Sequence, residues 1–273
     1  MDTQLASLIE RLATPAVMPL RSAELHHLAA MKTEVVTCGP YRSRVLIDEH
    51  DDPQAKRVLL LHGWGGHPMM LAQARQLLHA HGYRVYTPFL LGHDPASPAA
   101  CDLPAQYPLL LAMQATYGPF DSVVAHSAGG IILALAHSVG FVLNRVALLS
   151  APASLANLLQ HYLTLHRAAD HYLPQLGAYF QSRYPMLVDL QTERPYTFSE
   201  APVLILQGTR DQRINPANGA QIQAQLPGSQ LHMVEDTGHL GILSHPPSLQ
   251  TLVSFLCAKN ADHEQGSRHA GAY

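Results

Sequence analysis

A serine, an aspartate and a histidine occur in the chain in an order that would allow them to act together. Ser127 lies in the segment Ala-His-Ser-Ala-Gly (125–129), between an apolar run and a helical pattern, whereas Asp211 and His239 each follow a later apolar run. A serine hydroxyl is a poor nucleophile at neutral pH, so a histidine must accept its proton and a carboxylate must hold that histidine in the correct tautomer. The pattern predicts a catalytic site with Ser127 as nucleophile, His239 as general base and Asp211 as the orienting acid.

The neighbours of Ser127 suit a nucleophile that lies on a sharp turn. A strained turn followed by a closely packed helix needs small residues, and Ala125, Ala128 and Gly129 supply them. The helix that starts here would place its N-terminal amides behind the serine, where they stabilise a developing negative charge. The alternative is a serine that only caps a helix, which this segment alone does not exclude.

Two further residues near the predicted site have other interpretations. Asp236 is a second carboxylate close to His239, but it precedes the histidine by only three residues and is better suited to shaping the turn, so Asp211 is preferred. His126 adjoins the serine and would point away from it along the strand, as a packing or hydrogen-bonding side chain. Neither residue is therefore assigned a catalytic role.

Apolar runs and helical patterns alternate through most of the chain. Continuous apolar runs are typical of strands buried on both faces, and their alternation with helices indicates a parallel sheet covered by helices, which is an α/β fold. Two short β segments, 34–37 and 43–48, predict a hairpin at the sheet edge. The predicted strands are 57–61, 83–86, 122–125, 142–149, 203–206 and 230–234, and the predicted helices are 69–81, 108–115, 128–139, 216–225 and 247–258.

The segment 152–200 interrupts this alternation, because it contains two helical patterns, 155–165 and 172–180, but no strand-like run. We expect it to form a helical cap over the carboxyl edge of the sheet, where open α/β sheets bind ligands. Its apolar side chains would either wall a substrate pocket or simply pack the cap onto the core. These side chains are Leu158, Leu159, Tyr162, Leu163, Leu165, Tyr172 and Tyr179.

Residues 1–261 are predicted to form a single domain that includes this cap. The domain would begin with an amphipathic helix at 3–13, where apolar residues recur at helical spacing before two prolines. The last residues, 262–273, are rich in Gly, Ala and polar residues and are predicted to form a disordered tail.

Four segments resemble motifs of the α/β-hydrolase fold serine hydrolases. The segment 125–129 resembles the G-x-S-x-G nucleophile elbow of that family, with Ala125 in place of the first glycine. The segment 208–211 resembles its strand-end G-x-x-D, Gly238 and His239 resemble its G-H, and 62–63 resembles the His-Gly that opens its oxyanion loop. The resemblance extends over residues 35–258, apart from the insertion. It implies an esterase-like α/β-hydrolase fold, with a mostly parallel central sheet flanked by helices, to which the unmatched insertion adds the helical cap.

By this resemblance, the backbone N–H groups of Trp64 and Ala128 would form the oxyanion hole. The alternative for the glycine-rich segment 62–66 is a turn of purely structural use, and no phosphate-loop string is present. The loop 88–97 departs from the family's D-x-x-G-x-G-x-S pattern, since only Gly92 matches it. Because that loop is structural in most members, the departure concerns local turn geometry.

The resemblance implies a serine hydrolase that acts through an acyl-enzyme, most simply a carboxylesterase for an ester with a small or medium acyl group. It does not separate ester hydrolysis from peptidase or amidase activity, carbon–carbon bond hydrolysis or acyl transfer. A small-molecule receptor that keeps the three residues is an alternative from a different class. A serine nucleophile argues against the haloalkane dehalogenase branch, which uses an aspartate.

Charge and composition narrow the choice of partners. The net charge of −3, without a Lys/Arg cluster, argues against nucleic acid as a partner. The absence of a signal sequence and of a long apolar run favours a cytoplasmic protein.

Three widely spaced cysteines indicate neither a disulfide framework nor a zinc site. His161, His166 and His171 are five residues apart and cannot share one helix face, so neither a metal nor a cofactor is expected. The predicted partner is a small ester-like molecule, and no pattern indicates an oligomeric state.

Overall fold

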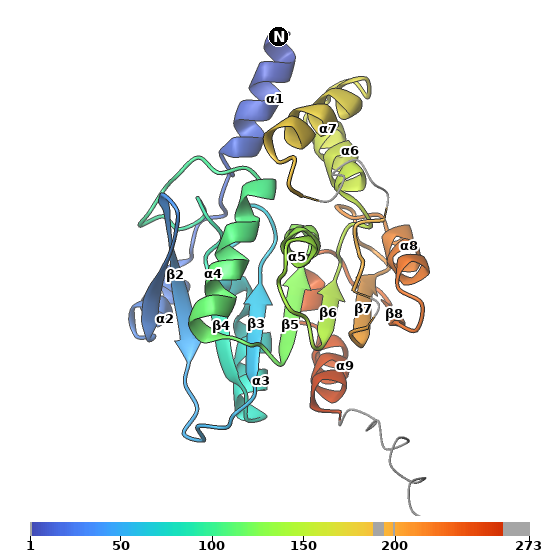
Figure 1. Cartoon of the computed structure of the whole chain (residues 1–273). Helices are drawn as coiled ribbons and strands as arrows, with labels where there is room; N and C mark the ends of the chain where they lie inside the picture. The colour runs from blue at the N-terminus through green and yellow to red at the C-terminus, as the bar shows by residue number, and fades with distance from the viewer. Residues whose placement is uncertain (1, 188–193, 199, 259–273) are drawn as a thin grey trace, which may run out of the picture.

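A single twisted sheet runs through the molecule, and most of its strands are parallel (Figure 1). Within the residues that the computed structural model describes, 2–187, 194–198 and 200–258, eight strands are hydrogen-bonded in the order β1-β2-β4-β3-β5-β6-β7-β8. The strands are β1 (Thr33–Cys38), β2 (Tyr41–Asp48), β3 (Arg57–Leu61), β4 (Arg84–Pro88), β5 (Ser122–His126), β6 (Val146–Leu149), β7 (Val203–Gly208) and β8 (Gln230–Val234). Only β2 runs antiparallel to its neighbours, β1 and β4, so the predicted hairpin lies at the sheet edge and the predicted α/β class is confirmed.

Helices cover both faces of the sheet, as the continuous apolar runs predicted. Along β5, Val123 and Ala125 belong to the apolar cluster on one face, whereas Val124 belongs to the cluster on the other. Successive residues of a strand point to opposite faces, so a strand buried on both faces must be apolar throughout. The first cluster packs against α4 (Tyr107–Tyr117), α5 (Ala128–Ser138) and α8 (Ala217–Gln225), and the second against α3 (Ala72–Ala80) and α9 (Pro246–Cys257).

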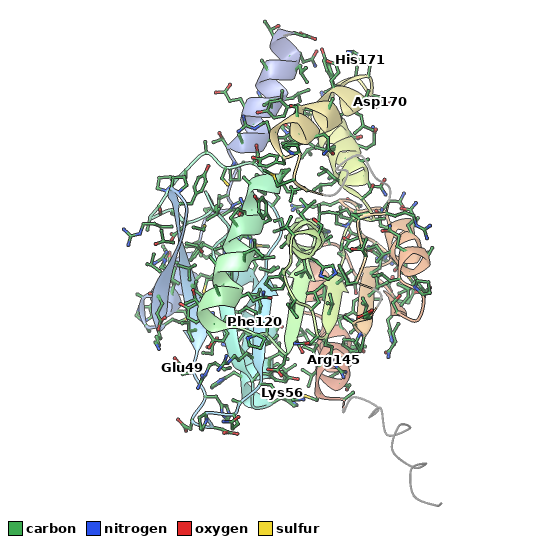
Figure 2. The ribbon with its side chains drawn as sticks, in the orientation of Figure 1. Glu49, Lys56, Phe120, Arg145, Asp170 and His171 are labelled. Atoms are coloured by element: carbon green, nitrogen blue, oxygen red, sulfur yellow. The ribbon has the colours of Figure 1, made fainter. Side chains whose placement is uncertain are left out.

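Two helices between β6 and β7 stand above the carboxyl ends of the strands (Figure 1). They are α6 (Leu155–Leu165) and α7 (Tyr172–Arg183), at the positions where helical patterns predicted them. Figure 2 shows Asp170 and His171, between these helices, at the opposite end of the molecule from Lys56 and Arg145. Since Lys56 and Arg145 directly precede β3 and β6, they mark the amino edge of the sheet, and the two helices cover the other edge.

The N-terminal helix, α1 (Thr3–Ala13), lies beside these cap helices rather than on the sheet (Figure 1). The hydroxyl of Tyr162, in α6, donates a hydrogen bond to the backbone oxygen of Leu8 at 3.0 Å. The hydroxyl of Tyr172, in α7, donates to the carboxylate of Asp2. The backbone N–H of Met18 then donates to the oxygen of Gly65 at 2.8 Å. Residues 2–18 thus connect the cap to the loop after β3.

Some elements differ from the sequence prediction. The strand predicted at 142–149 begins only at Val146, because Val142 is 52% exposed and its N–H donates to the side chain of Gln114 instead of to the sheet. The helix predicted at 69–81 is divided into a 3₁₀ segment, Pro68–Leu71, and α3. A helix that was not predicted, α2 (Ser22–Ala29), buries only Leu28 and so has little apolar periodicity.

A few predicted features fall wholly or partly outside the described residues. The tail predicted at 262–273 is one of them, and the predicted cap segment, 152–200, includes 188–193 and 199, which are also not described. Among the described residues, no helix is both long enough and apolar enough to cross a membrane.

Candidate active site

Ser127 occupies a strained turn between β5 and α5. Its φ of 55° and ψ of −130° lie in a region that a residue with a Cβ rarely adopts, and such strain is found where a nucleophile is held clear of its strand. The turn is packed so closely that a Cβ added to Gly63 would lie 2.8 Å from the Cβ of Ser127. A Cβ added to Gly129 would lie 3.0 Å from the backbone oxygen of His62. A methyl group at Gly63 would therefore force the turn to shift and one at Gly129 would make a tight contact, whereas Ala125 is accommodated in the buried strand.

A continuous chain of hydrogen bonds joins the three predicted residues. The hydroxyl of Ser127 lies 3.0 Å from Nε2 of His239, and Nδ1 of His239 lies 2.8 Å from Oδ2 of Asp211. All three residues are at least 92% buried, so water competes little for these bonds. In this arrangement the hydroxyl donates to Nε2, and the Nδ1–H group donates to the carboxylate. The structure thus brings together residues from the ends of β5, β7 and β8.

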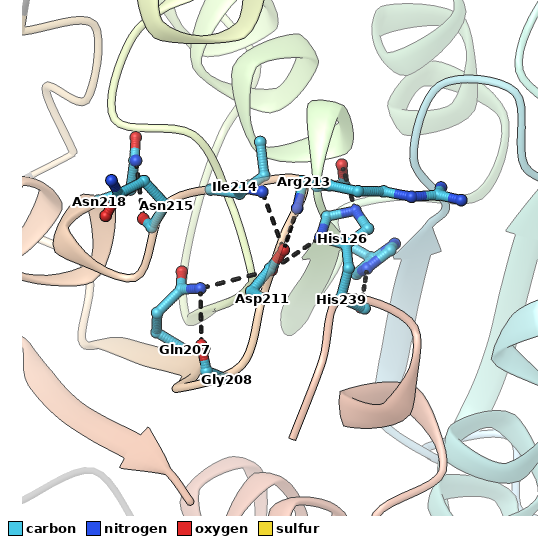
Figure 3. Close-up of polar contacts among 10 residues, drawn as sticks. His126, Gln207, Gly208, Asp211, Arg213, Ile214, Asn215, Asn218 and His239 are labelled. Carbon is cyan, nitrogen blue, oxygen red and sulfur yellow. Dashed lines mark hydrogen bonds and ion pairs between the residues drawn. The ribbon is translucent and has the colours of Figure 1, made fainter. Parts of the chain in front are cut away.

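Asp211 is held in place by the loop that it begins (Figure 3). Its Oδ1 accepts hydrogen bonds from the backbone N–H groups of Arg213, at 2.9 Å, and Ile214, at 2.8 Å. Burial acts to raise the pKa of Asp211, but the hydrogen bond and charge of His239, together with the two backbone donors, more than offset it and lower the pKa. The carboxylate is therefore ionised at neutral pH, which suits a group that orients an imidazole.

Asp236 does not contact His239 in this arrangement. Its side chain is 75% exposed and pairs with Arg210 at 2.6 Å. Its φ of 55° shows that it forms a tight turn between β8 and His239, a conformation that aspartate tolerates better than most residues. The structure therefore places Asp211, not Asp236, against the histidine.

His126 lies beside the site and does not point away from it, so that part of the sequence prediction is wrong. Its Nε2–H group donates to the backbone oxygen of His239 at 3.0 Å, and the two rings are 4.7 Å apart between centroids. Burial, followed by the nearby His239, lowers the pKa of His126 to about 3, which keeps it neutral. His126 thus supports the backbone of the histidine loop, which fits the predicted hydrogen-bonding role.

The predicted oxyanion loop, 62–66, is fixed by two buried histidines. Nε2 of His62 accepts a hydrogen bond from the N–H of Leu90 at 3.1 Å, and its Nδ1–H donates to the oxygen of Gly63 at 2.8 Å. Nε2 of His93 accepts from the N–H of Gly65 at 3.0 Å. Sequence reasoning did not find the role of His93, since the only signal was a histidine beside the matching glycine in the divergent loop 88–97.

The two amides predicted to form an oxyanion hole belong to this loop and to α5. Ala128 is the first residue of α5, so its N–H group has no partner within the helix. Within the described residues, the N–H groups of Trp64 and Ala128 donate no hydrogen bond. Both N–H groups are therefore free to donate, and both residues line the same cavity as Ser127.

A cavity of about 490 Å³ opens beside Ser127 between the sheet and the cap. Four of the apolar cap residues expected to wall a pocket do so, whereas three others, Leu163, Tyr172 and Tyr179, pack against the core cluster without lining this cavity. The N-terminal segment supplies a further wall that was not predicted. Besides Trp64 and Ala128, the apolar lining comprises Leu12, Ala16, Met18, Met70, Leu103, Leu155, Leu158, Leu159, Tyr162, Leu165, Phe180, Ile214 and Leu240.

Among the residues that the structure describes, the remaining histidines, carboxylates and cysteines form no metal site. No group of three or more His, Cys, Asp or Glu residues among those residues is placed to hold a metal ion. His161 lines the cavity, whereas Cys38 and Cys101 are buried and Cys257 is exposed, all three as free thiols.

Comparison with known proteins agrees with the fold and the motifs. The family whose model matches residues 58–249 is described as the alpha/beta hydrolase family. Since this match covers more than half of the chain, the protein belongs to the alpha/beta hydrolase family, as its motifs predicted. None of the curated proteins matches the chain.

Several solved structures share the architecture. The enol-lactonase from Burkholderia xenovorans LB400 superposes with a TM-score of 0.62 and 18% identity, over 82% of this chain and 100% of that one. Est1E from Butyrivibrio proteoclasticus superposes with a TM-score of 0.62 and 16% identity, over 83% of this chain and 99% of that one. A bromoperoxidase from Bacillus anthracis superposes with a TM-score of 0.61 and 16% identity, over 82% of this chain and 99% of that one. At such low identities these likenesses concern the fold alone.

Proposed function

We propose that this α/β hydrolase is a carboxylic ester hydrolase that acts through an acyl-enzyme on Ser127. The observation that carries the proposal is the buried hydrogen-bond chain from Asp211 through His239 to Ser127, which ends at an apolar cavity. This is the geometry that a serine needs in order to become a nucleophile at neutral pH. The strained backbone of Ser127 adds support, because it is a feature of nucleophile turns.

The reaction would proceed in two halves. As Oγ of Ser127 attacks the ester carbonyl carbon, Nε2 of His239 takes the hydroxyl proton, and the N–H groups of Trp64 and Ala128 stabilise the negative oxygen. The intermediate collapses, the carbon–oxygen bond to the alcohol breaks, and His239 returns the proton to the leaving alcohol. Water then attacks the acyl-enzyme with His239 as base, which releases the acid and restores Ser127. Asp211 keeps the imidazole in one tautomer and stabilises its charged form.

The cavity supports a substrate with a small or medium acyl group. Its volume of about 490 Å³ lies in the range of small-molecule sites, and its lining is predominantly apolar. An alkyl chain of a few carbons would bury its surface there, at roughly 25 cal/mol for each Å² removed from water.

Labelling with a fluorophosphonate probe tests the nucleophile directly. We expect wild type to be labelled, Ser127→Ala to remain unlabelled, and Ser254→Ala, an exposed serine on α9, to be labelled like wild type. A folded wild-type protein that resists labelling would contradict the proposal and favour a binding protein.

A panel of p-nitrophenyl esters of increasing acyl length, assayed beside the matching anilides, tests the reaction. We expect turnover of esters from acetate to octanoate, with the anilides much slower. Labelling at Ser127 without turnover of any ester would instead favour amide or carbon–carbon bond cleavage.

A further inference from the structure

Among the described residues, Arg213 and His161 line the cavity beside Ser127 with side-chain nitrogens that have no hydrogen-bond or ion-pair partner. Arg213 lies in the loop after β7, and His161 lies on α6. Both residues border the cavity beside Ser127 and also a second cavity of about 500 Å³, so they stand where the two meet. In the described part of the chain, no hydrogen bond or ion pair engages the guanidinium of Arg213 or the imidazole of His161.

The position of Arg213 is fixed by the same contacts that hold Asp211. Its own N–H and that of Ile214 donate to Oδ1 of Asp211, and Ile214 is buried, so the backbone here cannot easily move. Figure 3 shows the side chain of Arg213 extending from this loop toward the side of the site where His126 and His239 lie. Burial is the main cause of the lowered pKa values of His126 and His161, and the charge of Arg213 contributes to both.

The second cavity is polar, but most of its amide groups already have partners. Nδ2 of Asn157 donates to Oδ1 of Asn218 and to Oε1 of Gln221, both at 3.0 Å, which ties α6 to α8. Among the described residues lining either cavity, Asp211 is the only carboxylate, and it is bonded to His239. The guanidinium of Arg213 at the junction of the cavities therefore has no ion-pair partner among the described residues, and its N–H donors and that of His161 are free.

We propose that Arg213 and His161 bind a carboxylate of the substrate, so that the preferred substrate is an ester with an apolar chain in the cavity beside Ser127 and an anionic end at the junction. Arginine suits this role because its planar guanidinium presents two parallel N–H donors to a carboxylate. His161, whose pKa is lowered mainly by burial, would add one N–H donor. This inference rests on the proposed ester hydrolysis and specifies its substrate class.

Matched ester pairs test the proposal by activity. Monomethyl and dimethyl esters of the linear dicarboxylic acids from succinic to suberic acid share chain and leaving group but differ in charge. We expect wild type to prefer the monoesters in kcat/KM. Arg213→Gln should lower kcat/KM for the monoesters about tenfold, the value of one charge-assisted hydrogen bond, and leave the diesters unchanged. His161→Phe should give a smaller loss of the same kind.

The control variant is Arg210→Gln, in the same loop. Arg210 is exposed, pairs with Asp236 and borders neither cavity. We expect it to change neither class of ester. Equal losses for both ester classes in Arg213→Gln, or no loss for either, would overturn the proposal.

Binding separates this inference from the proposed reaction. Calorimetry with Ser127→Ala should detect adipate but not the neutral diamide of the same chain, and adding Arg213→Gln should weaken adipate binding about tenfold. Adipate binding that depends on Arg213, without hydrolysis of any ester by wild type, would support the anion site and reject the ester function. Hydrolysis of esters without a monoester preference, or adipate binding that is absent or insensitive to Arg213, would reject the anion site alone.

Discussion

The imidazole of His93 accepts a hydrogen bond from the backbone N–H of Gly65 at 3.0 Å, which joins the loop after β4 to the loop after β3. The backbone oxygen of Gly65 accepts a second bond, from the N–H of Met18 at 2.8 Å. The ring of His93 also lies edge-on to Trp64, with 4.7 Å between centroids. The peptide next to the amide proposed for the oxyanion hole is therefore held from both sides.

Replacing His93 with leucine removes the acceptor for Gly65 and loosens this loop. We expect kcat to fall about tenfold to a hundredfold with little change in KM, because the loop acts when the negative oxygen forms rather than when the substrate binds. His93→Gln keeps an acceptor oxygen and should retain most of kcat. Steady-state kinetics of both variants, with circular dichroism to verify folding, checks this expectation; an unchanged kcat in a folded His93→Leu protein would contradict it.

The close approach of Gly63 to Ser127 leaves no space for a methyl group. In Gly63→Ala the new Cβ would lie 2.8 Å from the Cβ of Ser127, so the loop or the serine must shift. We expect a loss of kcat of at least about a hundredfold, as for the loss of one oxyanion donor. Gly241→Ala is the matched control, since its Cβ would meet Thr237 at an ordinary 3.5 Å. Full activity in Gly63→Ala would show that the loop is not held against Ser127.

The three residues of the hydrogen-bond chain could be found from the sequence because each one follows an apolar run. Parallel strands bring their carboxyl ends to one edge of the sheet, so Ser127, Asp211 and His239 had to lie at the same edge once their runs were recognised as strands. Their order and their neighbouring glycines then selected the family. Local patterns therefore sufficed for this part of the site.

Other parts of the site depend on docking that no local pattern encodes. The bond between His93 and Gly65 connects two loops 28 residues apart, and the walls formed by Leu12 and Met18 depend on where α1 packs. Arg213 is exposed and carries no motif, so only the cavities reveal its position. Periodicity predicts which face of a helix is apolar, but not which partner that face meets.

The distinction between the two candidate carboxylates can be tested by a matched pair of variants. Asp211→Asn should lower kcat by about 10⁴-fold, because the amide no longer holds His239 in the tautomer that accepts the serine proton. Asp236→Asn should lower kcat less than about threefold, since its side chain is exposed and asparagine tolerates a positive φ. Similar losses in the two variants would reject Asp211 as the orienting acid.

Three buried histidines around the site make the free energy of unfolding depend on pH. Burial is the main cause of their lowered pKa values, which fall to about 4 for His93, to about 3 for His126 and well below the ordinary value for His62. In the unfolded chain they titrate near about 6.5. Below about pH 6.5 the unfolded state therefore binds more protons, and the folded state loses stability as the pH falls, by on the order of 1 kcal/mol per pH unit for each histidine.

Urea unfolding at a series of pH values between about 7 and 4 measures the slope of the free energy of unfolding against pH. His126→Gln should reduce it by the contribution of one histidine, while His26→Gln, on the exposed side of α2, should leave it unchanged. A stability that does not decline over this range would contradict the assignment of buried neutral histidines.

The wall that α1 contributes to the cavity should limit the length of the acyl chain. Leu12 is 8% exposed and faces the cavity together with Tyr162 of the cap. Leu12→Phe would fill part of the 490 Å³ space, so kcat/KM for hexanoate and octanoate esters should fall about tenfold while the acetate ester is unaffected. Leu5→Phe, on the same helix but outside the cavity lining, is the control. A uniform loss across all chain lengths in Leu12→Phe would mean that α1 stabilises the cap without selecting the substrate.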